Sequence, residues 1–125
     1  MSLSDEQQEF LLDFCLLVQF ARRLGFKVTP GELKRTIEQQ QIYFDTGRSR
    51  TMHSMHLLGL AGDLNIFKNG DYLLSYGPIT AMEMIIPLGV FWESLHKNNV
   101  WGGNFDKDFS RKDPWIDVPH FQRNR

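Results

Sequence analysis

The chain has 125 residues, of which 42% are hydrophobic and 23% are charged, and this composition excludes an intrinsically disordered protein. A chain of this length builds one core, so we expect a single domain over residues 1–125. The net charge of -1 gives no bulk attraction to nucleic acid or anionic membranes, and no run approaches the ~20 apolar residues of a membrane span. We therefore expect no nucleic-acid partner and no stable membrane association, and binding must arise at a local site.

The single cysteine and the N-terminal segment constrain the chemistry and the location of the protein. With Cys15 alone, the chain forms no internal disulfide and no thiolate zinc cluster, and we expect Cys15 to be a buried small hydrophobe. The acidic start MSLSDEQQEF lacks the basic and apolar regions of a signal peptide. We therefore expect the protein to stay in the cytoplasm where it is made until another protein or cell lysis releases it.

The first part of the chain predicts a long helix followed by an ambiguous segment. Ser4 followed by Gln7 predicts a capping box. Apolar residues then recur at intervals of three and four up to Gly25, which is typical of an amphipathic helix of about six turns. The next segment, FKVTPGELKR (26–35), fits either the opening of a second helix or an extended stretch, and propensity alone does not decide between them.

The middle of the chain predicts a helix and then a β-hairpin. Thr36 offers an N-cap ahead of a polar helix that ends at Gly47. The segment LAGDLNIF (60–67) has strand character. Asn69-Gly70 lies between this segment and a second apolar run, which is the strongest short-range signal for a hairpin turn.

The second half of the chain predicts a helix and a loop-rich tail. The helical pattern is interrupted at Pro87, where we expect a break, and the part after it presents an apolar face formed by Leu88, Phe91, Trp92 and Leu95. The tail from Lys97 is rich in loop-forming residues and ends in a predicted strand from Trp115 to Phe121. Helices therefore flank a small antiparallel sheet, and we predict an α+β fold.

The candidate chemistry lies in histidine and aspartate residues that are spread along the chain. A zinc hydrolase needs three protein ligands, an open position for water and a carboxylate that takes the proton of that water. The four histidines include no HExxH motif, which excludes the helical metalloprotease arrangement. His56 and Asp63 remain, seven residues apart, with His120 near the end of the chain and Asp117 placed to act as general base if His120 is a ligand. Isolated residues of these types more often lie on the surface or cap helices, so spacing leaves both alternatives open.

Two motifs resemble a family of zinc peptidases that act on bacterial cell walls. The segment SMHLLGLAGD (54–63) matches the S-x-H-x-x-G-x-A-x-D motif of the D-Ala-D-Ala carboxypeptidases and L-Ala-D-Glu endopeptidases, and DVPHF (117–121) matches their closing D/E-x-x-H motif. KRTIEQQQIYFDTG (34–47) resembles the R-T-x-x-x-Q segment of that family. Three further segments resemble its phage and prophage members: LNIFKNGDYL, FWESL and WGGNF. The resemblance extends from about Val28 to Gln122.

This resemblance implies a role for each matching residue. The implied ligands of a Zn²⁺ ion are His56, Asp63 and His120. Asp117 matches the catalytic general base, Arg35 matches the arginine that polarises the scissile carbonyl, and Ser54 matches a serine near the substrate and the metal. The family fold agrees with the predicted α+β class, and it favours the extended option for residues 26–35. Arg35 would then stand at the end of a strand and face the metal.

Several residues near these motifs keep two interpretations. His53 is either in the wall of a cleft, where it meets substrate, or behind the ligand residues, and we do not favour it as a fourth ligand, because that would fill the position that water needs. Trp101 either lines the cleft beside the open Gly102-Gly103 pair or packs in the core. Arg48 and Arg50 either meet acidic groups of a peptide substrate or lie in a solvated loop.

The sequence therefore predicts a monomeric, zinc-dependent peptidase whose partner is the stem peptide of peptidoglycan. We expect a phage or prophage endolysin of the L-Ala-D-Glu endopeptidase type, which waits in the host cytoplasm and acts on the cell wall in the periplasm. One alternative is a D-Ala-D-Ala carboxypeptidase that uses the same site. The other is a non-catalytic binding or virion-structural module that keeps the fold and the metal.

Overall fold

The computed structural model describes residues 1–49, 52–105 and 116–125, and the chain has the predicted α+β fold. The helices are α1 (Leu3–Arg23), α2 (Ile37–Asp45) and α3 (Pro78–Leu95). The strands are β1 (Lys27–Pro30), β2 (Ala61–Lys68), β3 (Asp71–Tyr72), β4 (Asn99–Trp101) and β5 (His120–Arg123). Short 3-10 turns occur at Met55–Leu58, Leu73–Tyr76 and Gly102–Asn104. Within the described ranges, no helix is both long and apolar enough to span a bilayer.

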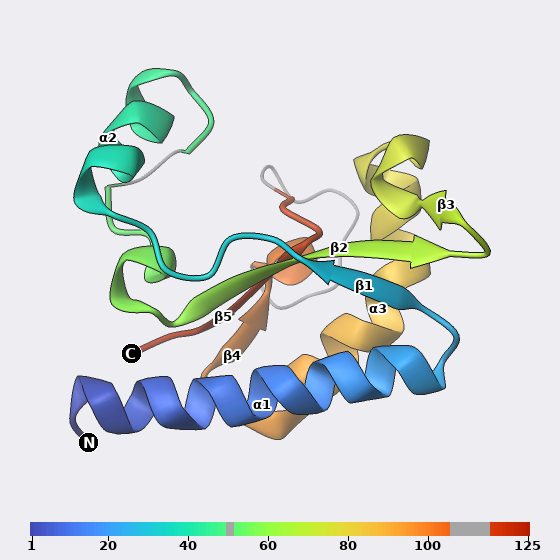
Figure 1. Ribbon diagram of the computed structural model, residues 1–125, viewed down its shortest axis with the longest axis horizontal. Helices are drawn as coiled ribbons and strands as arrows, with labels where there is room; N and C mark the ends of the chain where they lie inside the picture. The colour runs from blue at the N-terminus through green and yellow to red at the C-terminus, as the bar shows by residue number, and fades with distance from the viewer. Residues whose placement is uncertain (50–51, 106–115) are drawn as a thin grey trace.

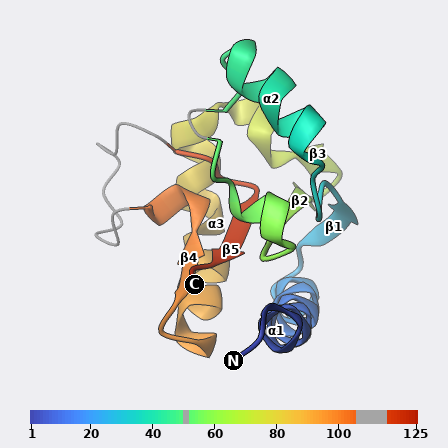
Figure 2. The same ribbon diagram turned by 90° about the vertical axis from the view of Figure 1, so that its left-hand side faces the viewer.

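The strands form one antiparallel sheet in the order β1-β2-β5-β4, with β3 paired to β2. The first half of β2 pairs with β5 and its second half with β1. Asn69 and Gly70, which connect β2 to β3, have φ angles of 52° and 85°, as a tight hairpin turn requires. The structure thus confirms the predicted hairpin and the extended option for the start of segment 26–35. In both views α1 lies below the strands and α2 above them (Figures 1 and 2).

The core lies between α1, α3 and the sheet, and the Trp92 ring of α3 is at its centre. The ring makes edge-to-face contacts with Phe10 and Phe14 of α1 and with Phe121 of β5, at centroid distances of 5.6, 6.3 and 6.0 Å. Its indole nitrogen donates to the Gln122 carbonyl at 3.0 Å. Trp92 therefore joins both long helices to the strand β5.

Arg123 provides a second connection between α1 and β5. Its side chain is only 4% exposed and forms ion pairs with Asp13 and Glu9 of α1, and its Nε donates to the Asn99 side chain of β4 at 3.0 Å. Because each buried charge has a partner, the cluster offsets the cost of desolvating the arginine. The short strand β5 is thereby fixed to the longest helix.

The first helix differs from its prediction at its start and on one face. Its N-cap is Ser2, whose hydroxyl accepts from the Asp5 backbone, while Asp5 accepts in return from the Ser2 backbone. The expected cap partner Gln7 instead donates to the Leu58 carbonyl at 2.7 Å and so ties α1 to the turn at 55–58. Cys15 is exposed rather than buried, because the packed face of α1 carries Phe14 and Leu17.

Two further predictions in the second half of the chain are wrong. Helix α3 continues through Pro87 without a break, because neighbours such as Ile85 and Leu88 are fully buried and packing compensates for the lost hydrogen bond. The last strand was expected to begin at Trp115, which lies outside the described residues, but it begins at His120. The residues just before it form a turn, in which the His120 amide donates to the Asp117 carbonyl at 3.1 Å. Strand β4 is missing from the prediction because three residues are too short to show periodicity.

Candidate metal centre

The three predicted ligands come together from two strands and a turn. Asp63 of β2 and His120 of β5 are direct cross-strand partners, so the ladder places their side chains on one face. His56 lies in the 3-10 turn at 55–58, just before β2. Ser54 caps the start of this turn, because its hydroxyl accepts a hydrogen bond from the His56 amide at 3.2 Å. Gly59 ends this turn with a left-handed φ of 67° and directs the chain into the strand. His56 and His120 are buried, and Asp63 is partly buried.

The ligand atoms form an equilateral triangle. Nε2 of His56, Oδ1 of Asp63 and Nδ1 of His120 are each 3.2 Å from the other two. A tetrahedral ion with bonds of about 2.0–2.1 Å requires donors that are about 3.3 Å apart. The spacing therefore fits a bound metal, and two imidazoles with one carboxylate are a donor set that Zn²⁺ takes.

The hydrogen bonds on the outer side of each imidazole favour one tautomer of the neutral ring. Nδ1 of His56 is 2.7 Å from the Leu33 carbonyl, and Nε2 of His120 is 2.6 Å from Oε1 of Gln122. Because both oxygens are acceptors, each of these nitrogens is the donor in the neutral ring, and the inner nitrogens face Asp63 with free lone pairs. In this tautomer the two inner nitrogens are free to bind a metal ion, whereas a ring that also carries a proton on its inner nitrogen donates to Asp63.

The close contact between Asp63 and His120 shifts the pKa of both side chains. Burial alone would raise the pKa of Asp63, but hydrogen bonds from His120 and His56 lower it to about 2. Burial alone would lower the pKa of His120, but the hydrogen bond to Asp63 and the charge of Asp117 outweigh it and raise this pKa above 6.5. The two shifts favour the charged forms of both side chains, an ionised Asp63 and a protonated His120.

Asp117 lies beside the triangle, with Oδ2 at 4.0 Å from Nδ1 of His120. Its side chain is partly buried, and this burial together with the charge of Asp63 raises its pKa above the usual 3.8. Its amide donates to the Gly102 carbonyl at 2.9 Å, and a Cβ on Gly102 would lie 2.0 Å from the Asp117 carbonyl oxygen. Gly102 is therefore needed for this close approach, which holds the carboxylate next to the ligands.

Arg35 lies on the same cavity, but not at the end of a strand as expected. Strand β1 ends at Pro30, and Arg35 follows in the loop before α2, where its amide donates to the His56 carbonyl at 2.9 Å. Its guanidinium group is held on several sides, by Glu32, Gln40, Ser54 and the ring of Tyr43. Among the described residues, Nη2 makes none of these hydrogen bonds and is left for another acceptor.

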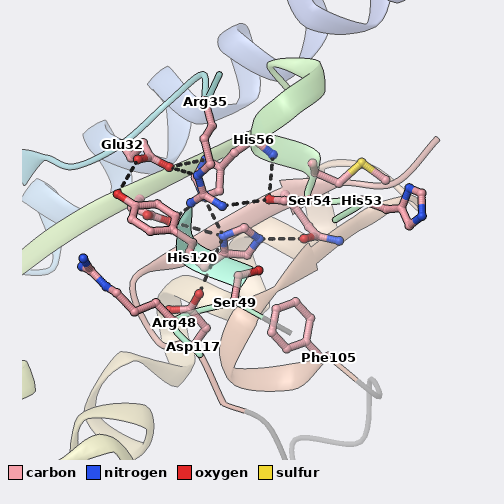
Figure 3. Close-up of a pocket in the computed structure, with 14 residues that line it drawn as sticks. Glu32, Arg35, Arg48, Ser49, His53, Ser54, His56, Phe105, Asp117 and His120 are labelled. Atoms are coloured by element: carbon pink, nitrogen blue, oxygen red, sulfur yellow. Dashed lines mark hydrogen bonds and ion pairs between the residues drawn. The ribbon is translucent and has the colours of Figure 1, made fainter. Parts of the chain in front are cut away.

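A cavity of about 680 Å³ opens over these groups (Figure 3). Ser54 is on its wall and accepts a hydrogen bond from Arg35 at 3.4 Å. His53 is exposed at its edge, with its ring directed away from the ligand histidines (Figure 3). Arg48 also lines the cavity, whereas Arg50 lies outside the described residues. Contacts of Ser54 and His53 with a substrate remain predictions.

The expectation that Trp101 lines the cleft is wrong. Its side chain is fully buried, and its indole nitrogen donates to the Val118 carbonyl at 2.8 Å. Gly103 was expected to leave space around Trp101, but the Trp101 ring packs directly against it. A Cβ on Gly103 would lie 2.5 Å from this ring, and a Cβ on Gly89 of α3 would lie 2.1 Å from it. Trp101 therefore belongs to the core, which was the alternative interpretation.

Three residues that were not predicted from the sequence also hold the site. Gln122 orients His120, and its position two residues further along a strand places both on one face, which is a signal that the sequence contains. Glu32 pairs with Arg35, and Tyr43 hydrogen-bonds Glu32 at 3.2 Å and lies under Arg35. No local sequence pattern identifies Glu32 and Tyr43 as site residues, because Glu32 lies in the loop after β1 and Tyr43 lies in α2, and they meet only in the folded chain.

Comparison with known proteins supports the fold. No family model and no curated protein sequence matches the chain. Among solved structures, it is similar to the crystal structure of the Serratia marcescens L-Ala D-Glu endopeptidase ChiX, with a TM-score of 0.61 and 20% sequence identity over 97% of this chain and 85% of that one. At this identity the similarity establishes a shared α+β fold, and the chemistry must be argued from the residues themselves.

Proposed function

We propose that this protein is a zinc-dependent peptidoglycan peptidase that hydrolyses a bond of the stem peptide, most simply the L-Ala-D-Glu bond. The observation that carries the proposal is the 3.2 Å triangle of His56, Asp63 and His120 with Asp117 beside it in an open cavity. The shared fold with an L-Ala D-Glu endopeptidase and the two matching motifs support the same substrate.

The residues of the site have complementary tasks in this reaction. A Zn²⁺ ion on the three ligands would supply Lewis acidity, which lowers the pKa of a water molecule toward neutrality. Asp117 takes the proton of the attacking water and returns it to the leaving amine, and its raised pKa brings it closer to the pH at which it acts. Arg35 donates to the oxygen of the scissile carbonyl as negative charge develops there, an interaction that contributes about 10²–10³ in rate.

The biological role is part of the same proposal. The segments LNIFKNGDYL, FWESL and WGGNF resemble phage and prophage members of the family, and they support a role in lysis of the host cell. The protein would then be held in the host cytoplasm and reach the wall only when the inner membrane opens. The substrate would be the stem peptide in the periplasm.

The test is digestion of purified peptidoglycan by the zinc-loaded protein, with and without a chelator, followed by mass analysis of the fragments. New N-terminal D-Glu on the stem peptides would support the endopeptidase. Release of D-Ala alone would instead support a D-Ala-D-Ala carboxypeptidase. Tight zinc binding without cleavage of any bond would contradict a peptidase and favour a binding or virion-structural module.

A further inference from the structure

A second arginine on the cavity, Arg48, has surroundings unlike those of Arg35. Its Cζ atom lies 4.8 Å from the centre of the Tyr43 ring, and its amide donates to the Tyr43 carbonyl at 2.8 Å. Backbone and side chain are thus both fixed to the last turn of α2. Arg48 is exposed, and its side chain lies at the edge of the cavity (Figure 3).

The charge of Arg48 has no counter-ion within the described part of the chain. Arg35 is neutralised by Glu32, and Asp63 faces the two ligand histidines, but Arg48 forms no ion pair with a described residue. A guanidinium group that stacks on an aromatic ring keeps its N–H edge free for the paired oxygens of a carboxylate. Arg48 is therefore a positioned cation on the cavity, and no described residue forms an ion pair with its guanidinium group.

We propose that Arg48 binds a carboxylate of the substrate, on the residue that supplies the leaving amine. This inference rests on the proposed function. In an L-Ala-D-Glu bond the D-Glu residue continues the chain through its γ-carboxyl group, so its α-carboxylate stays free next to the scissile nitrogen. The terminal D-Ala of a D-Ala-D-Ala bond has a carboxylate in the same position, whereas an internal bond of an ordinary protein has none.

The separation of the two arginines is compatible with this assignment. Their Cζ atoms lie 4.7 and 4.8 Å from the same ring centre, so they are at most about 9.5 Å apart, the sum of these distances. In the substrate, only three bonds separate the scissile carbonyl carbon from the carboxylate carbon. Arg35 can therefore donate to the carbonyl oxygen while Arg48 holds the carboxylate. Recognition of this carboxylate selects cell-wall peptides over ordinary ones.

The test compares two stem peptides that differ only in the α-group of D-Glu, one a carboxylate and the other a carboxamide. We expect the wild-type enzyme to cleave the carboxylate peptide with a kcat/KM about tenfold higher or more, as a charge-assisted hydrogen bond allows. In Arg48→Gln this ratio should fall to near one, and Arg48→Lys, which keeps the charge, should retain part of it. Arg23→Gln, an exposed arginine of α1 away from the cavity, should keep the full ratio.

The outcomes separate this inference from the function on which it rests. A preference that persists in Arg48→Gln, or an equal loss on both peptides, would overturn the role of Arg48 while leaving the peptidase intact. Cleavage of neither peptide by the wild-type protein, repeated with a D-Ala-D-Ala peptide and its C-terminal amide, would overturn the proposed function and this inference with it. Thermal unfolding of each variant verifies that it is folded, as expected for a change at an exposed residue.

Discussion

Asp63 and His120, 57 residues apart in the chain, are direct partners on neighbouring antiparallel strands, with Oδ1 at 3.2 Å from Nδ1. The ladder between β2 and β5 therefore sets the spacing of two ligand atoms before any ion binds. His56 completes the set from a turn that is held by the Leu33 carbonyl and the Ser54 hydroxyl. Such preorganisation favours metal binding, because little ordering of side chains remains to be done.

Removal of one ligand should abolish the stabilisation that zinc gives to the fold. With free zinc at 1,000 times its dissociation constant, the wild-type free energy of unfolding should rise by about 4 kcal/mol. Asp63→Asn should show almost no rise, because the amide is a far weaker ligand than the carboxylate. Urea denaturation with and without zinc measures this, and an equal rise in both proteins would exclude Asp63 as a ligand.

Asp117→Asn should separate catalysis from metal binding. Loss of the proton acceptor should lower kcat by about 10²–10⁴, as is typical for a general base, while zinc content stays at the wild-type value. Turnover on a stem peptide and metal analysis of the same sample provide both numbers. Loss of zinc in this variant would show instead that Asp117 is a ligand, and full activity would exclude it as the base.

Gln122 should control zinc affinity through the tautomer of His120. Its Nε2 donates to the Asn124 side chain at 2.6 Å, which turns Oε1 toward His120. Gln122→Ala removes this acceptor and should weaken zinc binding about 10- to 100-fold. Gln122→Glu retains an acceptor and should bind zinc at least as well as the wild type. Competition with a chelator measures the affinities, and equal values for both variants would contradict this role.

Zinc affinity should fall as the pH is lowered through the pKa of His120. This pKa is raised above 6.5 in the metal-free protein, so the proton is held to a higher pH and competes with the metal. Asp63, with a pKa of about 2, is ionised throughout and adds no slope near neutrality. Below the His120 pKa the affinity should drop about tenfold per pH unit, and chelator titrations that give a constant value from about pH 8 to pH 5 would refute the competition.

Replacement of Arg123 should destabilise the fold more than replacement of any exposed arginine. Arg123→Met leaves Asp13 and Glu9 without their buried partner and should lower the free energy of unfolding by about 3–5 kcal/mol. Arg125→Met is the matched control, because that side chain is 42% exposed in its pair with Glu6 and should cost less than about 1 kcal/mol. Similar losses in the two variants would show that the cluster does not secure β5.

The sequence alone predicted the elements that rest on local chemistry. The Thr36 cap, the Asn69-Gly70 turn and the apolar face of α1 depend on neighbours within a few residues. Their backbone preferences therefore appear in the sequence whatever the rest of the chain does. The errors arose where packing overrides such preferences, as at Pro87, whose helix is held by its buried neighbours, and at Trp101, which fills the core.

The same distinction between sequence and tertiary structure applies to the candidate site. The sequence by itself determined which residues are candidates, because matching motifs name the three ligands His56, Asp63 and His120 and the general base Asp117 without reference to distance. Only the tertiary structure decided that the three ligand atoms lie 3.2 Å apart and that Gln122 fixes the His120 ring. It also distinguished Arg35, which pairs with Glu32, from Arg48, which forms no ion pair with a described residue on the same cavity. Distance, burial and charge compensation are properties of side chains that meet from separate elements, and so they exist only once the chain has folded.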